Sequence, residues 1–596
     1  MNLRLLLFTA GFLCGSVLAP AQTLNVSPAG VAQADLAART QSLNDLFDEI
    51  WQDELSHSPI QASRIGDTRY DTQLPDYSVA VYNDQLAQDA QFVARLAAIA
   101  TAGMPKQQIL SRDLMIHQLM RAQESSQFKP WEMPVTAFSG LPATLPRLAG
   151  QLNFTTARDY DDYTNRLNKV PSAFRQITDN IMIGIEDQRV PPKSTLEQLL
   201  SEINALLAMK PEASPFAVPL REFPASISAA DQAGLREEVL TAITKQVYPA
   251  YQRFARFLQA VYIPAGRAEA GVWALPDGDA YYEFLVKQNT TTDLTPAQIQ
   301  QFGESWVARD EAAELALAKK LGYPKLAALR AAVAADPRLH PANAAQLLDA
   351  YRQDVAQMRA KLPDLFTAVP QMAVAVEAMP DWMRPDHGAA YFRPDTQGGT
   401  LYVNTADPAQ RSLADVESNV YDRVLPGEGF QTRVEREQTT FPVFRRWLMI
   451  PAFTEGWGLY AEQLGQDAGL YQDPYAEVAR LEYDEKASGA LVVDTGIHAD
   501  RWTRQQAIDY YHAHSGLSEA AIEKAVDRII AEPGEALAPK MGELEMLGLR
   551  AAAQKMLGAH FDLRTFDQEI VGSGALPLDM LSDRVAAWMD GRTGSR

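Results

Sequence analysis

Residues 419–431 read NVYDRVLPGEGFQ, and residues 441–465 read FPVFRRWLMIPAFTEGWGLYAEQLG. A Pro-Gly pair at 426–427 interrupts a helical pattern, because proline has no backbone N–H and its ring clashes with the carbonyl four residues back. The second segment continues as a helical pattern of aromatic and small residues. This stretch therefore predicts two helices that meet near a break, and we expect any chemistry of the chain to lie here.

Three carboxyl side chains accompany this break. Asp422 lies on the last uninterrupted turn, Glu428 follows the break, and Glu455 opens the second helix. Helical metallopeptidases build a metal site from two helices in this way, although two of the ligands are usually histidines. A simpler interpretation stays open for each residue: Glu455 as a carboxylate at a helix N-terminus, and the other two as surface acids.

The composition sets the broad class of protein. The chain has 596 residues, 47% of them hydrophobic, which is ample for a large core and too long for one small domain. The formal net charge of −21 disfavours a nucleic-acid partner or an anionic membrane surface. The sequence does not indicate an oligomeric state.

The amino-terminal segment, residues 1–21, has the features of a signal peptide. Arg4 precedes a short apolar run, and Ala-Pro-Ala at 19–21 matches a cleavage pattern. The run is too short to span a membrane as a mature helix. Cys14, the only cysteine, lies within it, and Leu13 is not the small residue expected before a lipidated cysteine. We therefore expect a periplasmic or secreted product with no membrane contact after cleavage, no disulfide and no thiolate chemistry.

The rest of the chain predicts a mainly α fold. Residues 22–38 read as a flexible leader, and residues 39–596 read as a single helical domain, in one body or in two lobes around a cleft. Alternating residues predict two strands at 388–394 and 399–405. Zincin sites often place an edge strand beside the metal helix, where it pairs with an extended peptide, so we expect the strand at 401–403 along the cleft wall.

Histidine spacing and glycine motifs exclude several enzyme classes. None of the eight histidines belongs to an HExxH motif. The chain has no Gly-x-Ser-x-Gly elbow, no Walker-type loop and no dinucleotide fingerprint. In the segment LVVDTGIHADRW, Asp494 and His498 stand four residues apart, which suits either an internal pair or a ligand site.

Several longer motifs resemble the bacterial domain of unknown function 885 family. They are TEGWGLYAEQLG at 454–465, ALVVDTGIHADRWTRQQAIDYY at 490–511, PGEALAPKMGELEMLGLR at 533–550 and FDLRTFDQEIVGSGALPLDML at 561–581. The resemblance covers essentially the whole mature chain. It implies a helical zinc metallopeptidase-like fold with a His-Glu-x-x-Pro-Gly-His-His motif, followed by Glu-Gly-Trp-Ala-Leu-Tyr-Ala-Glu.

The sequence of this chain differs from the family motif at the centre of the motif. The first histidine falls on Asp422, the glutamate expected as general base on Arg423, and the paired histidines on Glu428 and Gly429. The third expected ligand is kept as Glu455. The resemblance thus marks Asp422, Glu428 and Glu455 as the metal-ligand positions of this chain and assigns no catalytic residue.

Further changes affect the positions expected to contact substrate. The arginine that usually precedes Leu-Val-Val-Asp-Thr-Gly is Ala490, and the tyrosine of a Ser-Tyr-Lys motif is Pro539. Asp494, His498 and Lys540 are kept, and the resemblance implies that they contact the substrate.

These changes argue against ordinary zinc chemistry. Zinc prefers nitrogen and sulfur ligands, whereas carboxylates suit harder cations. Loss of a general base costs about 10²–10⁴ in rate, and Arg423 opposes a metal and can pair with the carboxylates. We expect no cofactor and a charge-paired site, with a divalent cation (Zn, Mn, Mg or Ca) as the alternative.

The function expected from the resemblance is that of a metallopeptidase-family protein that has lost zinc catalysis. Such a protein retains a cleft for a peptide or small peptide-like ligand. The alternative is an active metal-dependent hydrolase that uses an altered carboxylate site.

The signal sequence makes a direct prediction. The mature protein should begin at Gln22, because cleavage is expected after Ala21. Intact-mass measurement of protein exported by a bacterial host tests this. A retained Met1, or a lipid on Cys14, would contradict it.

Overall fold

The structure, a computed structural model, describes residues 28–381, 383–384 and 388–593. The expected signal peptide, residues 1–21, lies outside this range. The first helix, α1, spans Pro28–His57, so the part of the expected leader from residue 28 to 38 is helical. Proline at the first helical position and the alanines that follow suit a helix start. Among the described residues, no helix combines the length and apolarity needed to cross a membrane.

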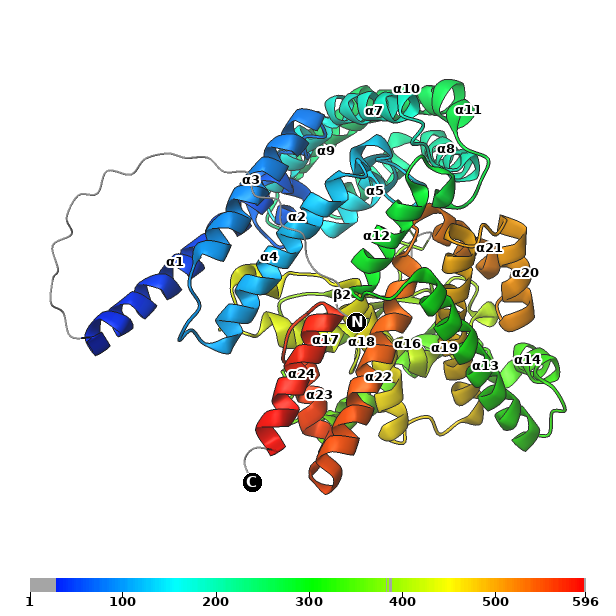
Figure 1. The fold of residues 1–596 in the computed structure, drawn as a ribbon. Coiled ribbons are helices and arrows are strands. Elements are labelled where there is room, and N and C mark those ends of the chain that lie inside the picture. Colours follow the sequence, from blue (N-terminus) through cyan, green and yellow to red (C-terminus); the bar gives the residue numbers. More distant parts are fainter. Residues whose placement is uncertain (1–27, 382, 385–387, 594–596) are drawn as a thin grey trace.

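The amino-terminal half is almost entirely helical (Figure 1). α1 is followed by three helices, α2 (Pro59–Arg64), α3 (Val79–Ala98) and α4 (Lys106–Ser126). The next group comprises α5 (Leu141–Leu148), α6 (Ala157–Leu167), α7 (Val170–Glu186), α8 (Lys193–Ala208), α9 (Ala229–Ala242), α10 (Tyr248–Phe257) and α11 (Ile263–Ala265), with π-helical turns at Ile243–Val247 and Leu258–Tyr262.

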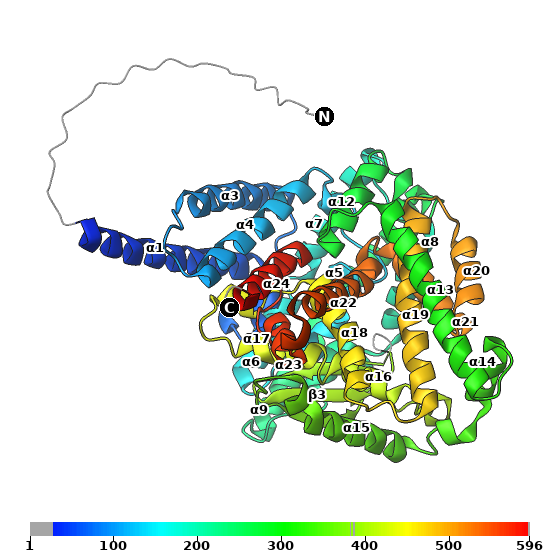
Figure 2. The same cartoon turned by 60° about the horizontal axis from the view of Figure 1, so that its bottom comes forward.

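The carboxyl-terminal half contains the only sheet found in the described residues. Its first helices are α12 (Gly278–Thr290), α13 (Pro296–Lys320), α14 (Leu326–Ala335) and α15 (Ala344–Leu365). After the sheet come α16 (Val416–Arg423), α17 (Glu428–Arg436), α18 (Pro451–Asp467), α19 (Pro474–His498), α20 (Arg504–His514), α21 (Glu519–Ala531), α22 (Ala538–Leu557), α23 (Leu563–Val571) and α24 (Leu578–Thr593). Figure 2 shows α13 running beside α19. The expected mainly α fold is confirmed.

The sheet has three strands in the order β1-β3-β2. β2 (Ala390–Pro394) and β3 (Gly398–Val403) match the two predicted strands, whereas β1 (Ala373–Ala378) was not predicted. β1 pairs parallel with β3, and β2 pairs antiparallel with it. The strand at 401–403 is therefore central, with both edges already paired, and the expectation that it offers an edge to a peptide was wrong.

The buried side chains form two large clusters. One lies within residues 135–263 and fills the group from α5 to α11. The other joins α1, α3 and α4 to α15, the sheet, α16–α18 and α22–α24. The first helices of the chain therefore pack with its last helices, which places the region around α16–α18 at the centre of the larger core.

Two glycines allow α18 and α22 to cross closely. A Cβ added to Gly542 would lie 1.7 Å from the carbonyl oxygen of Ala452, and one added to Gly456 would lie 2.5 Å from the Cα of Gly542. Neither separation is sterically possible, so both positions require glycine in this packing. The crossing positions the start of α18, where Glu455 lies.

Gly542→Ala is expected to destabilise the protein. The added methyl group meets backbone, which cannot rotate away, so the helices must separate at a cost of about 1–3 kcal/mol or more. Gly548→Ala on the same helix is the matched control, because a Cβ there meets nothing within 4 Å. That variant should be neutral or more stable by up to about 1 kcal/mol. Denaturant unfolding distinguishes the two, and equal stabilities would contradict the crossing.

Candidate functional site

A cavity of about 620 Å³ lies among α16–α21 and the segment that leads into α22. The side chains of Asp422, Glu428 and Glu455 all line it. The three positions lie on α16, α17 and α18, one more helix than the two that the sequence predicts, and they share one cavity. Its other lining residues are Asn289, Arg423, Pro451, Leu459, Tyr483, Lys486, Ala487, Ala490, Tyr511, Ala525, Arg528, Ile529, Glu532, Glu535, Ala536 and Pro539.

The Pro-Gly break brings Asp422 and Glu428 to the same cavity. α16 ends at Arg423 and α17 begins at Glu428, as the sequence predicts. Gly427 lies so close to α16 that an added Cβ would be 1.6 Å from the carbonyl oxygen of Asp422. The indole Nε1 of Trp457 on α18 donates to the carbonyl of Pro426 at 2.8 Å, which holds the break against α18.

Asp422 is held by a tyrosine and an arginine. The residue is 4% exposed, and its Oδ2 accepts a hydrogen bond from the hydroxyl of Tyr483 at 2.8 Å. Nη2 of Arg423 lies 3.8 Å from the same oxygen and donates to the Tyr483 hydroxyl at 3.2 Å. Burial raises the pKa of Asp422, while Arg423 and Tyr483 oppose the rise. The carboxylate thus has its charge partner within the protein.

The neighbouring helix provides space for this carboxyl group. A Cβ added to Gly458 would lie 2.0 Å from Oδ1 of Asp422. Any larger residue at this position of α18 would displace Asp422 from its present place.

The other two carboxyl groups have strongly raised pKa values. Burial, followed by the charge on Asp422, raises the pKa of Glu428 to about 8. Burial, followed by the charge of Glu535, raises the pKa of Glu455 to about 7. The carboxyl group of Glu455 lies inside the protein, and its side chain is exposed toward the cavity that it lines. Both acids therefore keep a share of their protons near neutral pH.

The donor set does not fit the zinc ion that the family motif implies. The three carboxylates offer only oxygen, the cation Arg423 lies beside one of them, and none of the lining residues is a histidine. Within the part of the chain that the structure describes, no three His, Cys, Asp or Glu side chains are placed to hold a metal ion together. A divalent cation on these carboxylates stays a prediction that the geometry does not support.

Asp494, His498 and Lys540 do not line the cavity. The carboxylate of Asp494 accepts from the hydroxyl of Tyr282 at 2.6 Å and from the backbone N–H of Gly534 at 3.0 Å. All three side chains are fully buried.

The partners of His498 and Lys540 are likewise internal. His498 accepts from the N–H of Val272 at 3.2 Å through Nδ1 and donates to the carbonyl of Ile529 at 2.9 Å through Nε2. Lys540 pairs with Asp484 and Glu543. These contacts hold helices together, and the expected contact of the three residues with substrate stays a prediction that they do not support.

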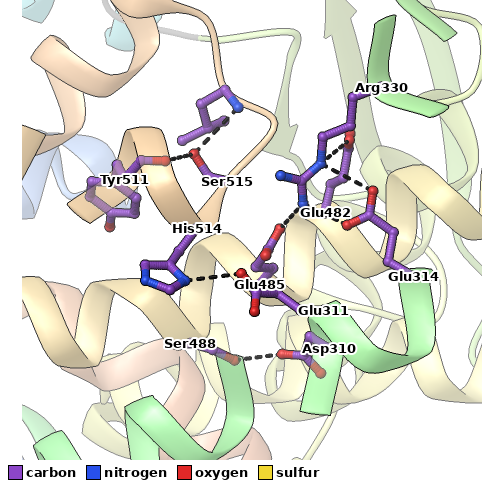
Figure 3. Close-up of polar contacts among 11 residues, drawn as sticks. Asp310, Glu311, Glu314, Arg330, Glu482, Glu485, Ser488, Tyr511, His514 and Ser515 are labelled. Atoms are coloured by element: carbon purple, nitrogen blue, oxygen red, sulfur yellow. Dashed lines mark hydrogen bonds and ion pairs between the residues drawn. The ribbon is translucent and has the colours of Figure 1, made fainter. Parts of the chain in front are cut away.

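An ion-pair network, drawn in Figure 3, connects α19 to α13 and α14. α19 carries several of the cavity-lining residues. Arg330 of α14 lies 2.5 Å from Glu314 of α13 and 2.6 Å from Glu485 of α19. The hydroxyl of Ser488 on α19 donates to Asp310 of α13 at 2.9 Å. Because Glu314 and Glu485 are buried, loss of Arg330 would leave both carboxyl groups without this partner, which is strongly unfavourable. α19 therefore has little freedom to shift relative to α13.

Sequence reasoning missed the cavity residues of α19 and α21. Tyr483 and Lys486 lie on α19, and Arg528 lies on α21. The sequence contains a signal that could have identified Lys486. The family resemblance implies an arginine at the position of Ala490, and Lys486, four residues earlier, lies on the same face of the helix. No motif marks Arg528.

Glu428→Gln is expected to change how stability depends on pH. The pKa of Glu428 rises from 4.5 to about 8 on folding. Its contribution to the free energy of unfolding is therefore fully present below about pH 4.5 and is lost as pH rises to about 8. Glutamine has no such dependence. The difference in free energy of unfolding, variant minus wild type, should grow by about 1–2 kcal/mol between pH 5 and pH 8, after allowance for solvent in the cavity.

Urea unfolding at both pH values measures this difference. Glu523→Gln, at an exposed position of α21, is the control and should follow the wild type. Parallel pH dependences for wild type and Glu428→Gln would show that this carboxyl group titrates normally.

Comparisons with other proteins support the fold and identify the family of this chain. A crystal structure of a "putative lipoprotein" from Colwellia psychrerythraea is similar, with a TM-score of 0.88 and 26% identity over 93% of this chain and 100% of that chain. A "putative lipoprotein of unknown function" from Shewanella oneidensis, at 16% identity, shares the fold with a TM-score of 0.70 over 91% of this chain and 99% of that chain. No curated protein matches. The family model for "Bacterial protein of unknown function (DUF885)" matches residues 59–585, so the chain belongs to the DUF885 family.

Proposed function

We propose that this protein is an exported member of the DUF885 family that binds a peptide or small peptide-like ligand and lacks zinc-dependent peptidase activity. The observation that carries the proposal is the set of residues at the motif positions. Asp422, Arg423 and Glu428 line one cavity, and Arg423 is paired with Asp422. The protein itself thus supplies a cation where the motif implies a metal.

Arg423 cannot take the part of a general base. A base must accept a proton from water, whereas a guanidinium is protonated at all physiological pH values and has no acceptor. Tyr483 and Asp422 raise the pKa of Arg423 further above its ordinary value. The group beside Asp422 is therefore a permanent cation.

The cavity suits a small ligand that carries charges of both signs. Its volume of about 620 Å³ falls within the range of about 300–1,000 Å³ for small-molecule sites. Glu455 and Glu428 can accept from an ammonium group, and Lys486 and Arg528 can donate to a carboxylate. A short peptide presents both groups, and its binding requires no metal.

Export is proposed on two observations. The first is the amino-terminal segment with its apolar run and Ala-Pro-Ala pattern. The second is that the two similar structures are described as putative lipoproteins. Both favour a location outside the cytoplasm, which for this chain is the periplasm or the exterior.

One observation favours a second candidate function. The carboxyl groups of Asp422, Glu428 and Glu455 line the same cavity, together with those of Glu532 and Glu535. Carboxylates are the ligands of hard cations such as Mn²⁺ and Mg²⁺. The alternative function is therefore an active metal-dependent hydrolase with this altered site, and the experiment must distinguish it from a peptide-binding protein without activity.

The test combines binding and cleavage of a mixed library of short peptides. Purified mature protein is incubated with the library, with zinc or with manganese, and bound and cleaved peptides are identified by mass spectrometry. We expect retained peptides and no cleavage that a chelator abolishes. Cleavage that is chelator-sensitive and lost in Glu455→Ala would establish the alternative.

A matched pair of variants tests whether peptides bind in the cavity. Ala490 lines the cavity, so Ala490→Phe should fill part of it and lower peptide retention by about tenfold or more. Ala551→Phe adds the same ring to an exposed position of α22 and should retain peptides like the wild type. Equal retention by both variants would place the ligand elsewhere.

A further inference from the structure

We infer that Tyr511 binds the ligand in the cavity by donating a hydrogen bond from its hydroxyl to a carbonyl group. The apolar residues beside Tyr511 then contact an apolar side chain of the same ligand. Tyr511 lies on α20 and lines the cavity of about 620 Å³. The inference rests on the proposed peptide-like ligand and adds which of its groups the protein recognises.

The hydroxyl of Tyr511 forms no hydrogen bond with any residue that the structure describes. Tyr511 is only 1% exposed. Its backbone carbonyl accepts from the hydroxyl of Ser515 at 2.7 Å, and Figure 3 shows this contact, whereas no contact is drawn from the hydroxyl on the ring. A buried hydroxyl without a hydrogen bond is unfavourable, so this group is left for a partner that enters the cavity.

Three other buried tyrosines show how Tyr511 differs. Tyr282 is also 1% exposed, but its hydroxyl donates to Asp494 at 2.6 Å. The hydroxyls of Tyr262 and Tyr421 lack a hydrogen bond with the described residues, and both are fully enclosed by protein. The hydroxyl of Tyr511 is neither paired nor enclosed, because Tyr511 lines the cavity. A ligand can therefore reach it.

The ring of Tyr511 is held against α19. A Cβ added to Gly489 of α19 would lie 3.1 Å from Cε1 of this ring, which is closer than ordinary contact. Gly489 therefore allows the ring to pack directly on the helix. The ring of Tyr510 lies on another side, 6.5 Å away between ring centres. Because packing fixes the ring, the hydroxyl is oriented before a ligand binds, and little freedom is lost on binding.

Apolar residues adjoin Tyr511 in the wall of the cavity. Tyr511 and Ile529 belong to one buried hydrophobic cluster, and Ala525 and Ala536 pack against that cluster. All four residues line the cavity. An apolar group of the ligand would cover this surface and remove it from water, which is favourable. The hydrogen bond and the apolar contact therefore fall on neighbouring parts of one ligand.

The charges near this apolar wall favour an uncharged acceptor at the hydroxyl. Glu532 and Glu535, close to Ala536 in the sequence, also line the cavity, and they oppose an anionic group there. Arg528 lies 3.6 Å from Glu535, which offsets its charge. The carbonyl of a peptide bond is uncharged and accepts a hydrogen bond, and a phenolic hydroxyl donates one. The geometry thus suits a peptide-like ligand with an apolar residue whose carbonyl reaches Tyr511.

The experiment measures peptide binding by Tyr511→Phe, which removes only the hydroxyl. Peptides that the whole mature protein retains from a mixed library are synthesised, and their affinities are measured by calorimetry. Tyr511→Phe should bind them about 2- to 10-fold more weakly, as expected for the loss of one hydrogen bond. It should keep the urea midpoint of the wild type or exceed it, because the hydroxyl bonds to no described residue.

Tyr510→Phe is the matched control, since it makes the same change at the neighbouring residue of α20, which does not line the cavity. It should bind the peptides like the wild type. Equal binding by Tyr511→Phe and the wild type, or a lower urea midpoint of Tyr511→Phe, would overturn the inference. A wild-type protein that retains no peptide would refute the proposed function and, with it, this inference.

Peptide analogues test the carbonyl contact directly. Each peptide bond in turn is replaced by an alkene, which removes one carbonyl group. One replacement should weaken binding to the wild type and have no further effect on binding to Tyr511→Phe, because both changes remove the same hydrogen bond. Additive losses at every position would show that Tyr511 does not contact a carbonyl group.

A second pair of variants tests the apolar contact. Peptides retained by the wild type should be enriched in leucine, methionine or phenylalanine. Ala525→Asp should remove this enrichment, because it places a charge in the apolar wall, whereas Ala551→Asp, at an exposed position of α22, should preserve it. Retained peptides without an apolar preference would refute the inference and leave the proposed function standing.

Discussion

The carboxylate of Asp422 lies in the protein interior, where a charge without a partner is strongly unfavourable. Tyr483 and Arg423 provide its hydrogen bond and its counter-charge, and Gly458 provides its space. These contacts join α16, α18 and α19. One buried carboxylate thus links three of the helices that line the cavity.

An internal cation and a bound metal are two solutions to the same electrostatic problem. Several carboxylates that face one cavity repel one another, and a positive charge among them relieves the repulsion. Here Arg423 supplies that charge, and proton uptake by Glu428 and Glu455 relieves the remainder. A buried charge pair is tolerated only when its geometry is good. The ion pairs of Arg330 hold α19 in place and so maintain this geometry.

Much of the fold was predictable from residue patterns. Apolar spacing predicted the helices, and alternation predicted β2 and β3 close to their observed bounds. β1 escaped because its segment, AVAVEA, is short and rich in alanine, which has little preference for strands. Without β1, the central position of β3 could not be foreseen, since the order of strands depends on which segments meet in space.

The sequence by itself determined the local structure of the site: the Pro-Gly break, the position of Asp422 before it and of Glu428 after it, and the family to which the chain belongs. Covalent geometry and residue order decide these features within a few residues. Only the tertiary structure decided that Lys486 and Arg528 face the cavity while Asp494 and His498 pack inside. Those outcomes depend on which faces of α19 and α21 are turned toward their neighbours, and that is set by long-range packing.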